Sequence, residues 1–116
     1  MELSKKIYLA IPYSHPDVEI RKVRFELANE MSAKLLQQGY NVLSPISHSH
    51  PISLYMDNSN DGDFWCERSL EWLKYCDELW IYCLSGWKDS KGIKKEIIAA
   101  QMLNIPILYL DKNNEQ

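Results

Sequence analysis

The hydrophobic and polar positions of the chain change period along the sequence, and each period predicts one kind of element. Short apolar runs of the kind typical of strands lie at residues 6–11, 40–45, 78–84 and 106–110. The third run, ELWIYCL, is apolar at nearly every position. This composition indicates a parallel strand that is covered on both faces.

Three segments between these runs predict helices, because their apolar residues recur every three or four positions. They span residues 17–38, 61–76 and about 90–104. Their apolar faces carry Ile20, Val23, Leu27, Met31 and Leu35 in the first helix, and Trp65, Ser69, Trp72, Leu73 and Cys76 in the second. Asp17 is a suitable N-cap for the first helix, and Gly39 suits the position after its end. Residues 46–60 are rich in Ser, His, Pro, Asn and Asp, which predicts a loop.

The alternation of strands and helices predicts an α/β sandwich around a parallel sheet. The chain has 116 residues, the size of one domain, so residues 1–116 are interpreted as a single domain. Right-handed crossovers leave few topologies, and we expect the strand order 2-1-3-4. In that order the winding direction reverses between the first and third strands. Ligands of such sheets bind beyond the carboxyl ends of the strands at this point.

Composition and charge narrow the classes of function. Hydrophobic residues make up 46% of the chain and charged residues 25%, an ordinary balance for a globular domain. The net charge of −3 argues against nucleic acid as a partner, and no apolar run is long enough to cross a membrane. Cys66, Cys76 and Cys83 lack a C-x-x-C spacing, which indicates inert, reduced core thiols. The start of the chain has no signal-peptide pattern, so we expect a cytoplasmic protein.

Three polar segments follow the strands that meet at the reversal of winding. They read IPYSHPD, SPISHSHP and LSGWKDSKG. Because the carboxyl ends of these strands share one edge of the sheet, their side chains are expected in one neighbourhood. This neighbourhood contains Tyr13, Ser14, His15, His48, His50, Ser90, Gly92 and Glu96.

The third segment offers the most specific chemistry. Ser90 and Gly92 lie where a helix begins, so exposed backbone N–H groups there suit a phosphate, and Gly92 permits close approach of a ligand. Glu96 follows beside an apolar run. A carboxylate shielded in a pocket can attack an electrophilic carbon, such as an anomeric carbon, and form a covalent intermediate. Spacing alone, however, favours an exposed Glu96 that pairs with a neighbouring lysine.

Over nearly its whole length the sequence resembles the nucleoside 2-deoxyribosyltransferase superfamily. The resemblance rests on IYLAIPY, SLEWLKYCDELWIYCL and SKGIKKEIIAAQMLNIPILYL, in that order. It is strongest to small members with a segment like SPISHSHP, and the chain is also similar to the 2′-deoxynucleoside 5′-phosphate N-hydrolases. The superfamily pattern S/D-x-G-x-x-x-E is met by Ser90, Gly92 and Glu96. The resemblance implies a flavodoxin-like or Rossmann-like three-layer sandwich with four to five strands, Glu96 as the nucleophile at the sugar C1′, and Ser90 with Gly92 near a phosphate or hydroxyl.

One residue departs from the superfamily pattern D-L-x-W-L-x-x-A-D. Its first Asp helps to protonate the leaving base, and Ser69 stands there in SLEWLKYCD. A Ser hydroxyl is no acid near neutral pH, so another group must do this work or the reaction is lost. His48, His50 and Asp89 are candidates. The second acid of the pattern, Asp77, is expected at the amino end of the third strand, away from the site, in a structural role.

Other side chains in these segments keep more than one interpretation. His48 and His50 contact a ligand, donate a proton or only order their loop by hydrogen bonds. A metal site lacks an obvious third ligand, so neither a metal nor another cofactor is expected. Tyr13 stacks on a base or sugar, or it packs beside Pro12. Arg21 or Arg24 reaches a phosphate, or both are solvated.

The substrate contacts expected from the sequence also include Ser69, Trp87 and Asp89, although Trp87 equally suits packing. The hypothesis is an enzyme that hydrolyses or transfers at the N-glycosidic bond of a nucleoside or nucleotide through Glu96. The alternative is a non-catalytic nucleotide-binding module, or an oligomeric scaffold with a degenerate pocket. Because four Trp and seven Tyr are many for this length, a homo-oligomer is expected. Trp65 and Trp72 are assigned to the core or to that subunit contact.

Overall fold

The computed structural model describes residues 5–57 and 62–111, which form four strands, four α-helices and one short 3-10 helix. The strands are β1 (Lys6–Ala10), β2 (Asn41–Leu43), β3 (Glu78–Cys83) and β4 (Ile107–Asp111). The helices are α1 (Val18–Gln37), α2 (Pro45–Ser53), α3 (Gly62–Leu73), η1 (Trp87–Asp89) and α4 (Lys91–Met102). All strand pairs in the sheet are parallel. The order is β2-β1-β3-β4, which confirms the predicted topology.

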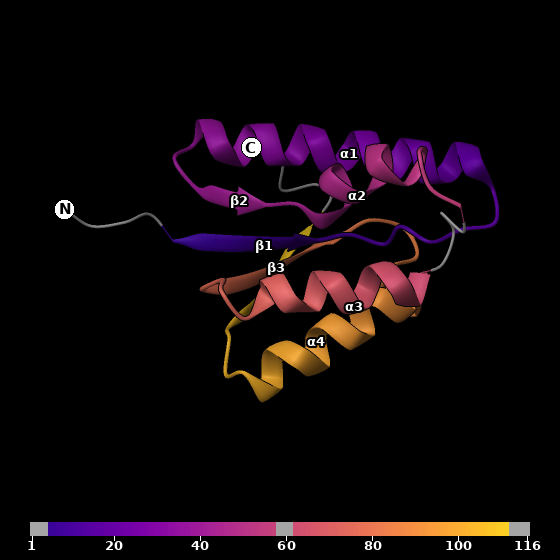
Figure 1. Ribbon diagram of the computed structural model, residues 1–116. Helices are drawn as coiled ribbons and strands as arrows, with labels where there is room; N and C mark the ends of the chain where they lie inside the picture. Colours follow the sequence, from indigo (N-terminus) through magenta and orange to yellow (C-terminus); the bar gives the residue numbers. More distant parts are fainter. Residues whose placement is uncertain (1–4, 58–61, 112–116) are drawn as a thin grey trace.

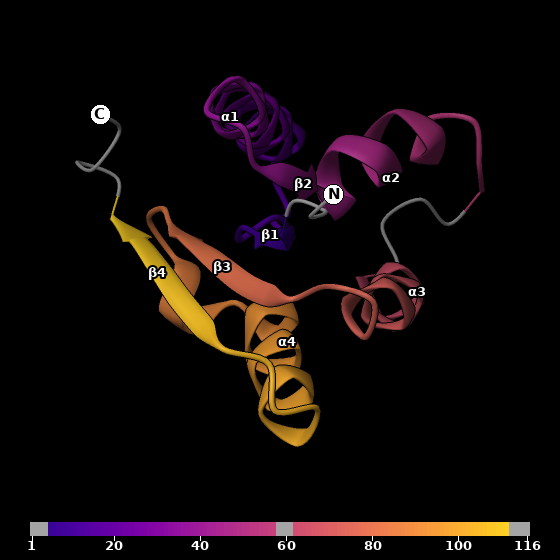
Figure 2. The same ribbon diagram turned by 90° about the vertical axis from the view of Figure 1, so that its left-hand side faces the viewer.

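The sheet separates two layers of helices (Figures 1 and 2). Helices α1 and α2 lie on one face, and α3 and α4 lie on the other. Each face has its own apolar cluster, because alternate residues of a strand point to opposite sides. Ile7, Leu9, Trp80 and Tyr82 pack under α1, while Tyr8, Ala10, Leu79 and Ile81 pack toward α3 and α4. The central strands are therefore buried on both sides, as the run ELWIYCL predicted.

Helix α1 follows the sequence prediction closely at both ends. The Asp17 side chain accepts a hydrogen bond from the backbone N–H of Glu19, and Gly39 adopts a φ of +98° just beyond the helix. The predicted apolar face is wrong at one residue, because the surface of Val23 is 53% exposed. Val23 lies on the flank of the buried stripe, whose centre passes through Ala28, Met31 and Leu35.

The predicted loop at residues 46–60 is wrong over its first half, which forms α2. Ser44 is the N-cap and accepts a hydrogen bond from the backbone of Ser47, while Pro45 occupies the first turn. Both features favour a helix start, although the composition of the segment is typical of a loop. Residues 58–60 of the predicted loop, and Asp61 at the predicted start of α3, lie outside the described residues.

Helix α3 is shorter than its predicted range but presents the predicted face, with Trp72 as the exception. It ends at Leu73, so Cys76 lies beyond it. Leu73 is buried, but Trp72 is 54% exposed and does not belong to the core. Among the helices in the described ranges, none has both the length and the apolar character that crossing a membrane requires.

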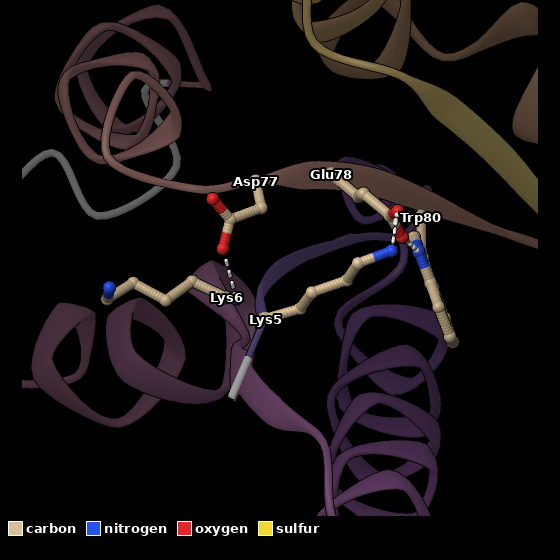
Figure 3. A network of polar contacts seen from close by, with 5 residues as sticks. All are labelled: Lys5, Lys6, Asp77, Glu78 and Trp80. Atoms are coloured by element: carbon tan, nitrogen blue, oxygen red, sulfur yellow. Dashed lines mark hydrogen bonds and ion pairs between the residues drawn. The ribbon is translucent and has the colours of Figure 1, made fainter. Parts of the chain in front are cut away.

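A polar network holds β1 and β3 together at the amino end of the sheet (Figure 3). The Asp77 carboxylate accepts a hydrogen bond from the backbone N–H of Lys6 at 2.8 Å. Glu78 pairs with Lys5 at 2.8 Å and accepts a hydrogen bond from the indole of Trp80 at 2.8 Å. Asp77 therefore lies at the end of the strand opposite to the switch point, as predicted, and it has a structural partner there.

Candidate active site

A cavity of about 480 Å³ opens beyond the carboxyl end of β1, between α2 on one side of the sheet and α3 with α4 on the other. Its position is the switch point at which the strand order reverses. Most of the side chains that the sequence placed in one neighbourhood line this cavity. They are Tyr13, Ser14, His15, His50, Ser90, Gly92 and Glu96. Arg21 and Ser69, which the sequence offered separately as ligand contacts, also line it.

Glu96 is buried at the wall of the cavity and does not face bulk water. Only 8% of its surface is exposed, and the O–H of Tyr8 donates to its Oε2 at 2.5 Å. Burial raises the pKa of Glu96 to about 7, although the hydrogen bond from Tyr8 lowers it. The expectation that spacing favoured, an exposed Glu96 paired with a lysine, is wrong. The neighbouring Lys95 pairs instead with Asp63 of α3, at 2.8 Å.

Tyr8 is a site residue that the sequence did not reveal. Its phenol reaches Glu96 from the middle of the buried strand β1, across 88 positions of sequence. Burial, the charge of Glu96 and the hydrogen bond to it hold the pKa of Tyr8 well above its usual range, while Ser69 opposes this rise. Tyr8 therefore stays protonated and remains a donor to Glu96. The only sequence signal was a phenol within an otherwise aliphatic strand.

Two further lining residues of α3 were assigned elsewhere. Trp65, which the sequence assigned to the core or to a subunit contact, lines the cavity. All three thiols are free and half-buried: Cys76 and Cys83 pack against the core as predicted, whereas Cys66 lines the cavity. Burial, followed by the charge of Glu96, raises the pKa of Cys66, which keeps it a neutral thiol.

On the opposite wall, His50 of α2 is held by aromatic neighbours. Its Nδ1 lies 2.6 Å from the Oη of Tyr13, and its ring stacks on Phe25 with centroids 4.2 Å apart. Burial and then the charge of Arg21 lower the pKa of His50. Tyr13 thus contacts His50 through its hydroxyl, in addition to lining the cavity.

His48 does not line this cavity, although the sequence grouped it with His50. Because residues 45–53 form a helix, side chains two positions apart point to nearly opposite sides. His48 is exposed and faces a shallow groove between α1 and β2, beside Asn29 and Ser32. The structure therefore separates the two histidines that the HSH motif offered as equal candidates.

Trp87 and Asp89 also lie outside the cavity lining. Both belong to η1, where Asp89 is exposed and Trp87 packs at 5.5 Å from the ring of Tyr109. Packing, the alternative interpretation of Trp87, is therefore the one observed. Arg24 likewise braces the chain, because its guanidinium donates to the carbonyls of Ser14 and Ser85 at 3.2 Å each.

The start of α4 forms the remaining wall. The Ser90 hydroxyl accepts a hydrogen bond from the backbone N–H of Ile93 at 3.2 Å, which makes Ser90 the N-cap. Gly92 follows in the first turn and leaves the backbone bare at the cavity. The end of the helix that carries positive partial charge therefore faces the same space as Glu96. Within the described residues, no three His, Cys, Asp or Glu side chains gather in a metal-binding group.

Comparisons with known proteins agree with this architecture. A family model described as "Domain of unknown function (DUF1937)" matches residues 5–111. Among solved structures, a 2-deoxyribosyltransferase from Bacillus psychrosaccharolyticus aligns with a TM-score of 0.63 and 21% sequence identity, covering 91% of this chain and 72% of that one. This likeness confirms the fold that the resemblance to deoxyribosyltransferases implied. A comparison with curated proteins gives no match.

Proposed function

The chain belongs to the DUF1937 family, and from its fold and the buried Glu96 we propose that it breaks the N-glycosidic bond of a nucleoside or nucleotide. Ionised Glu96 attacks C1′ of the sugar, and the bond to the base breaks with its electron pair on the base. Water then attacks C1′ and gives hydrolysis, or a second base attacks and gives transfer. The sugar remains covalently bound to the Glu96 carboxylate between the two steps.

The observation that carries this proposal is a buried glutamate at the wall of a cavity at the switch point of a parallel sheet. Only 8% of the Glu96 surface is exposed, yet the residue lines a cavity of about 480 Å³. This volume lies in the ordinary range for small-molecule sites. A buried carboxylate whose hydrogen-bond partner is the neutral phenol of Tyr8 is costly for the fold, and such costs are typical of functional sites.

The same cavity suits a sugar that carries a hydroxyl or phosphate at its 5′ position. The first turn of α4, with Ser90 and Gly92, presents backbone N–H groups near Glu96. Arg21 on the opposite side supplies a positive charge at the cavity lining. A ligand held at the start of α4 lies one turn of helix from the Glu96 carboxylate.

A substrate panel tests the proposal. The purified protein is incubated with deoxynucleosides, their 5′-monophosphates and NAD, and chromatography measures the free base. A deoxynucleoside whose 2′-hydrogen is replaced by fluorine in the arabino configuration slows release of the sugar, so intact mass spectrometry is expected to show the sugar bound to Glu96. Thermal stabilisation by members of the panel without any free base would instead support a binding module.

Replacement of Tyr8 by phenylalanine is expected to move the acid limb of the pH–activity profile to higher pH. Glu96 must be ionised to attack, and its pKa is about 7 with the Tyr8 hydrogen bond in place. Loss of that donor removes the one interaction that lowers this pKa, so the midpoint rises by on the order of one pH unit. The test compares kcat/KM of both proteins between pH 5 and 9. A profile that keeps its midpoint would contradict this role of Tyr8.

Replacement of Gly92 by alanine is expected to weaken substrate binding without harming the fold. A Cβ at this position would meet Ser90 Oγ at 3.8 Å, an ordinary contact, so stability stays the same or rises by up to about 1 kcal/mol. A ligand against the backbone of Gly92 would meet the new methyl group, and KM is expected to rise about tenfold. Thermal unfolding and KM measure the two effects separately. An unchanged KM would place the ligand away from α4.

A further inference from the structure

The proposed reaction needs a proton donor for the leaving base, in addition to the nucleophile Glu96. When the bond from C1′ to the base breaks, the base carries away an electron pair, and a neutral nucleobase leaves readily only if it gains a proton. The nucleophile and the leaving group occupy opposite sides of the carbon in a displacement. A group across the cavity from Glu96 therefore faces the leaving base, and the following inference rests on the proposed function.

The groups beside Glu96 are unsuitable proton donors, including Ser69 at the position of the superfamily's acid. Tyr8 donates to Glu96 itself, and Ser69 interacts with Tyr8. Cys66 lies close enough to Glu96 for its pKa to rise further through that charge. These residues belong to β1 and α3, on the α3 and α4 side of the sheet that also carries Glu96. They surround the attacking carboxylate, and neither a Ser hydroxyl nor a phenol or thiol with a raised pKa is an effective acid near neutral pH.

The opposite wall holds His50 in a fixed orientation. His50 belongs to α2, on the other side of the sheet. Phe25 of α1 stacks on its ring with an interplanar angle of 19°, and Tyr13 Oη lies 2.6 Å from its Nδ1. The ring is thus held on one face and at one nitrogen. Because His50 lines the cavity and Tyr13 engages Nδ1, the proposed ligand contact falls to the second ring nitrogen, Nε2.

Arg21 completes a chain of hydrogen bonds toward His50. It lies close enough to Tyr13 that its charge and hydrogen bond stabilise the phenolate form, although burial is the larger effect and raises the pKa of Tyr13. Tyr13 therefore keeps its proton at rest and donates to Nδ1 of His50. Burial and the charge of Arg21 disfavour the imidazolium form of His50. A neutral His50 that accepts at Nδ1 carries its proton on Nε2.

We propose that the pair Tyr13–His50, supported by Arg21, is the proton donor to the leaving base. The Nε2 proton of His50 passes to a ring nitrogen of the base as the C1′–N bond breaks. Nδ1 takes the phenol proton of Tyr13, and the phenolate that forms faces the guanidinium of Arg21. When water attacks C1′ and releases Glu96, the proton that water loses returns to the pair.

A matched pair of substrates tests this role. Deoxyguanosine 5′-monophosphate needs a proton on its leaving guanine, whereas the N7-methylated form is cationic and its base leaves neutral without one. Both the nucleosides and the 5′-monophosphates are assayed, and spontaneous loss of the methylated base is subtracted. His50→Gln is expected to lower kcat/KM for the neutral substrate by about 10²-fold and for the methylated one by less than about threefold. Tyr13→Phe is expected to show the same selectivity with a smaller loss.

Two further variants separate the possible failures. His48→Gln lies on the same helix but outside the cavity, so it is expected to match the wild type on both substrates. Glu96→Gln is expected to lose activity on both substrates. Full activity of this variant would overturn Glu96 as the nucleophile, whereas absence of cleavage by the wild type on every substrate of the panel would overturn the proposed function itself. If His50→Gln loses both substrates equally, or keeps both, while Glu96→Gln is inactive, the proton-donor role is wrong and the nucleophile assignment stands. Circular dichroism and thermal unfolding of each variant verify that its fold is retained.

Discussion

Replacement of Glu96 by glutamine is expected to lower the rate of glycosidic cleavage by on the order of 10³-fold or more. The amide has nearly the same shape and still accepts the hydrogen bond that Tyr8 donates, so the cavity keeps its form. Its oxygen is too weak a nucleophile to attack C1′, and loss of a covalent nucleophile costs several powers of ten in rate. The measurement is kcat/KM on the best substrate of the panel, at a pH above 7 where the wild-type carboxylate is ionised.

Glu30→Gln is a suitable control. It replaces the same carboxylate by the same amide, but at an exposed position on α1 away from the cavity. It is expected to keep wild-type activity. The fluorinated trapping substrate gives an independent readout, since the mass of wild type rises by one sugar and that of Glu96→Gln does not. Equal cleavage by Glu96→Gln and wild type would show that the nucleophile is another group or that water attacks directly.

The topology was accessible from the sequence because it depends on local signals. Each signal concerns only a few neighbouring residues: an apolar run marks a strand, and the cap at Asp17 and the glycine after α1 mark the ends of a helix. The preference for right-handed crossovers then sets the order of the strands. The same logic brought the loops after β1, β2 and β3 to one edge of the sheet. The cavity at that edge follows from topology alone.

What the sequence did not reveal depends on contacts between distant residues. Spacing on α4 does not say whether Glu96 meets water or protein, because the α3 residues that bury it come from elsewhere in the chain. The hydrogen bond from Tyr8 joins residues 88 positions apart, so no local pattern contains it. Whether a side chain is ionised also depends on the residues that surround it, which a local pattern does not show.

The prediction that both histidines of the HSH motif reach the cavity was wrong for a different reason. Its composition is typical of a loop, and in a loop both histidines reach the same space. The cap at Ser44 and the proline at position 45 start a helix instead, and the helix turns His48 away from the cavity while His50 faces it. A cap followed by a proline was the signal in the sequence that could have separated the two roles.

Glu96→Gln is also expected to make the protein more stable at alkaline pH. The pKa of Glu96 is about 7 in the folded protein, against an ordinary value of 4.5. Because the folded pKa is the higher one, the folded protein binds this proton more tightly, and stability falls as pH rises from 4.5 to about 7. The loss approaches about 3 kcal/mol above pH 7, at 1.36 kcal/mol for each pKa unit. Glutamine does not ionise and avoids this loss.

Denaturant unfolding of both proteins at pH 5 and pH 8 measures the effect. The other titrating groups are common to the two proteins, so the difference in unfolding free energy between them isolates Glu96. We expect a small difference at pH 5, and at pH 8 an advantage of up to about 3 kcal/mol for the variant. Glu30→Gln, an exposed change of the same kind on α1, is measured in parallel as the control. If the difference in unfolding free energy between Glu96→Gln and wild type does not grow with pH, Glu96 ionises in the folded protein as easily as in water. Burial would then not raise the pKa of Glu96, and the buried environment would not account for its role as the nucleophile.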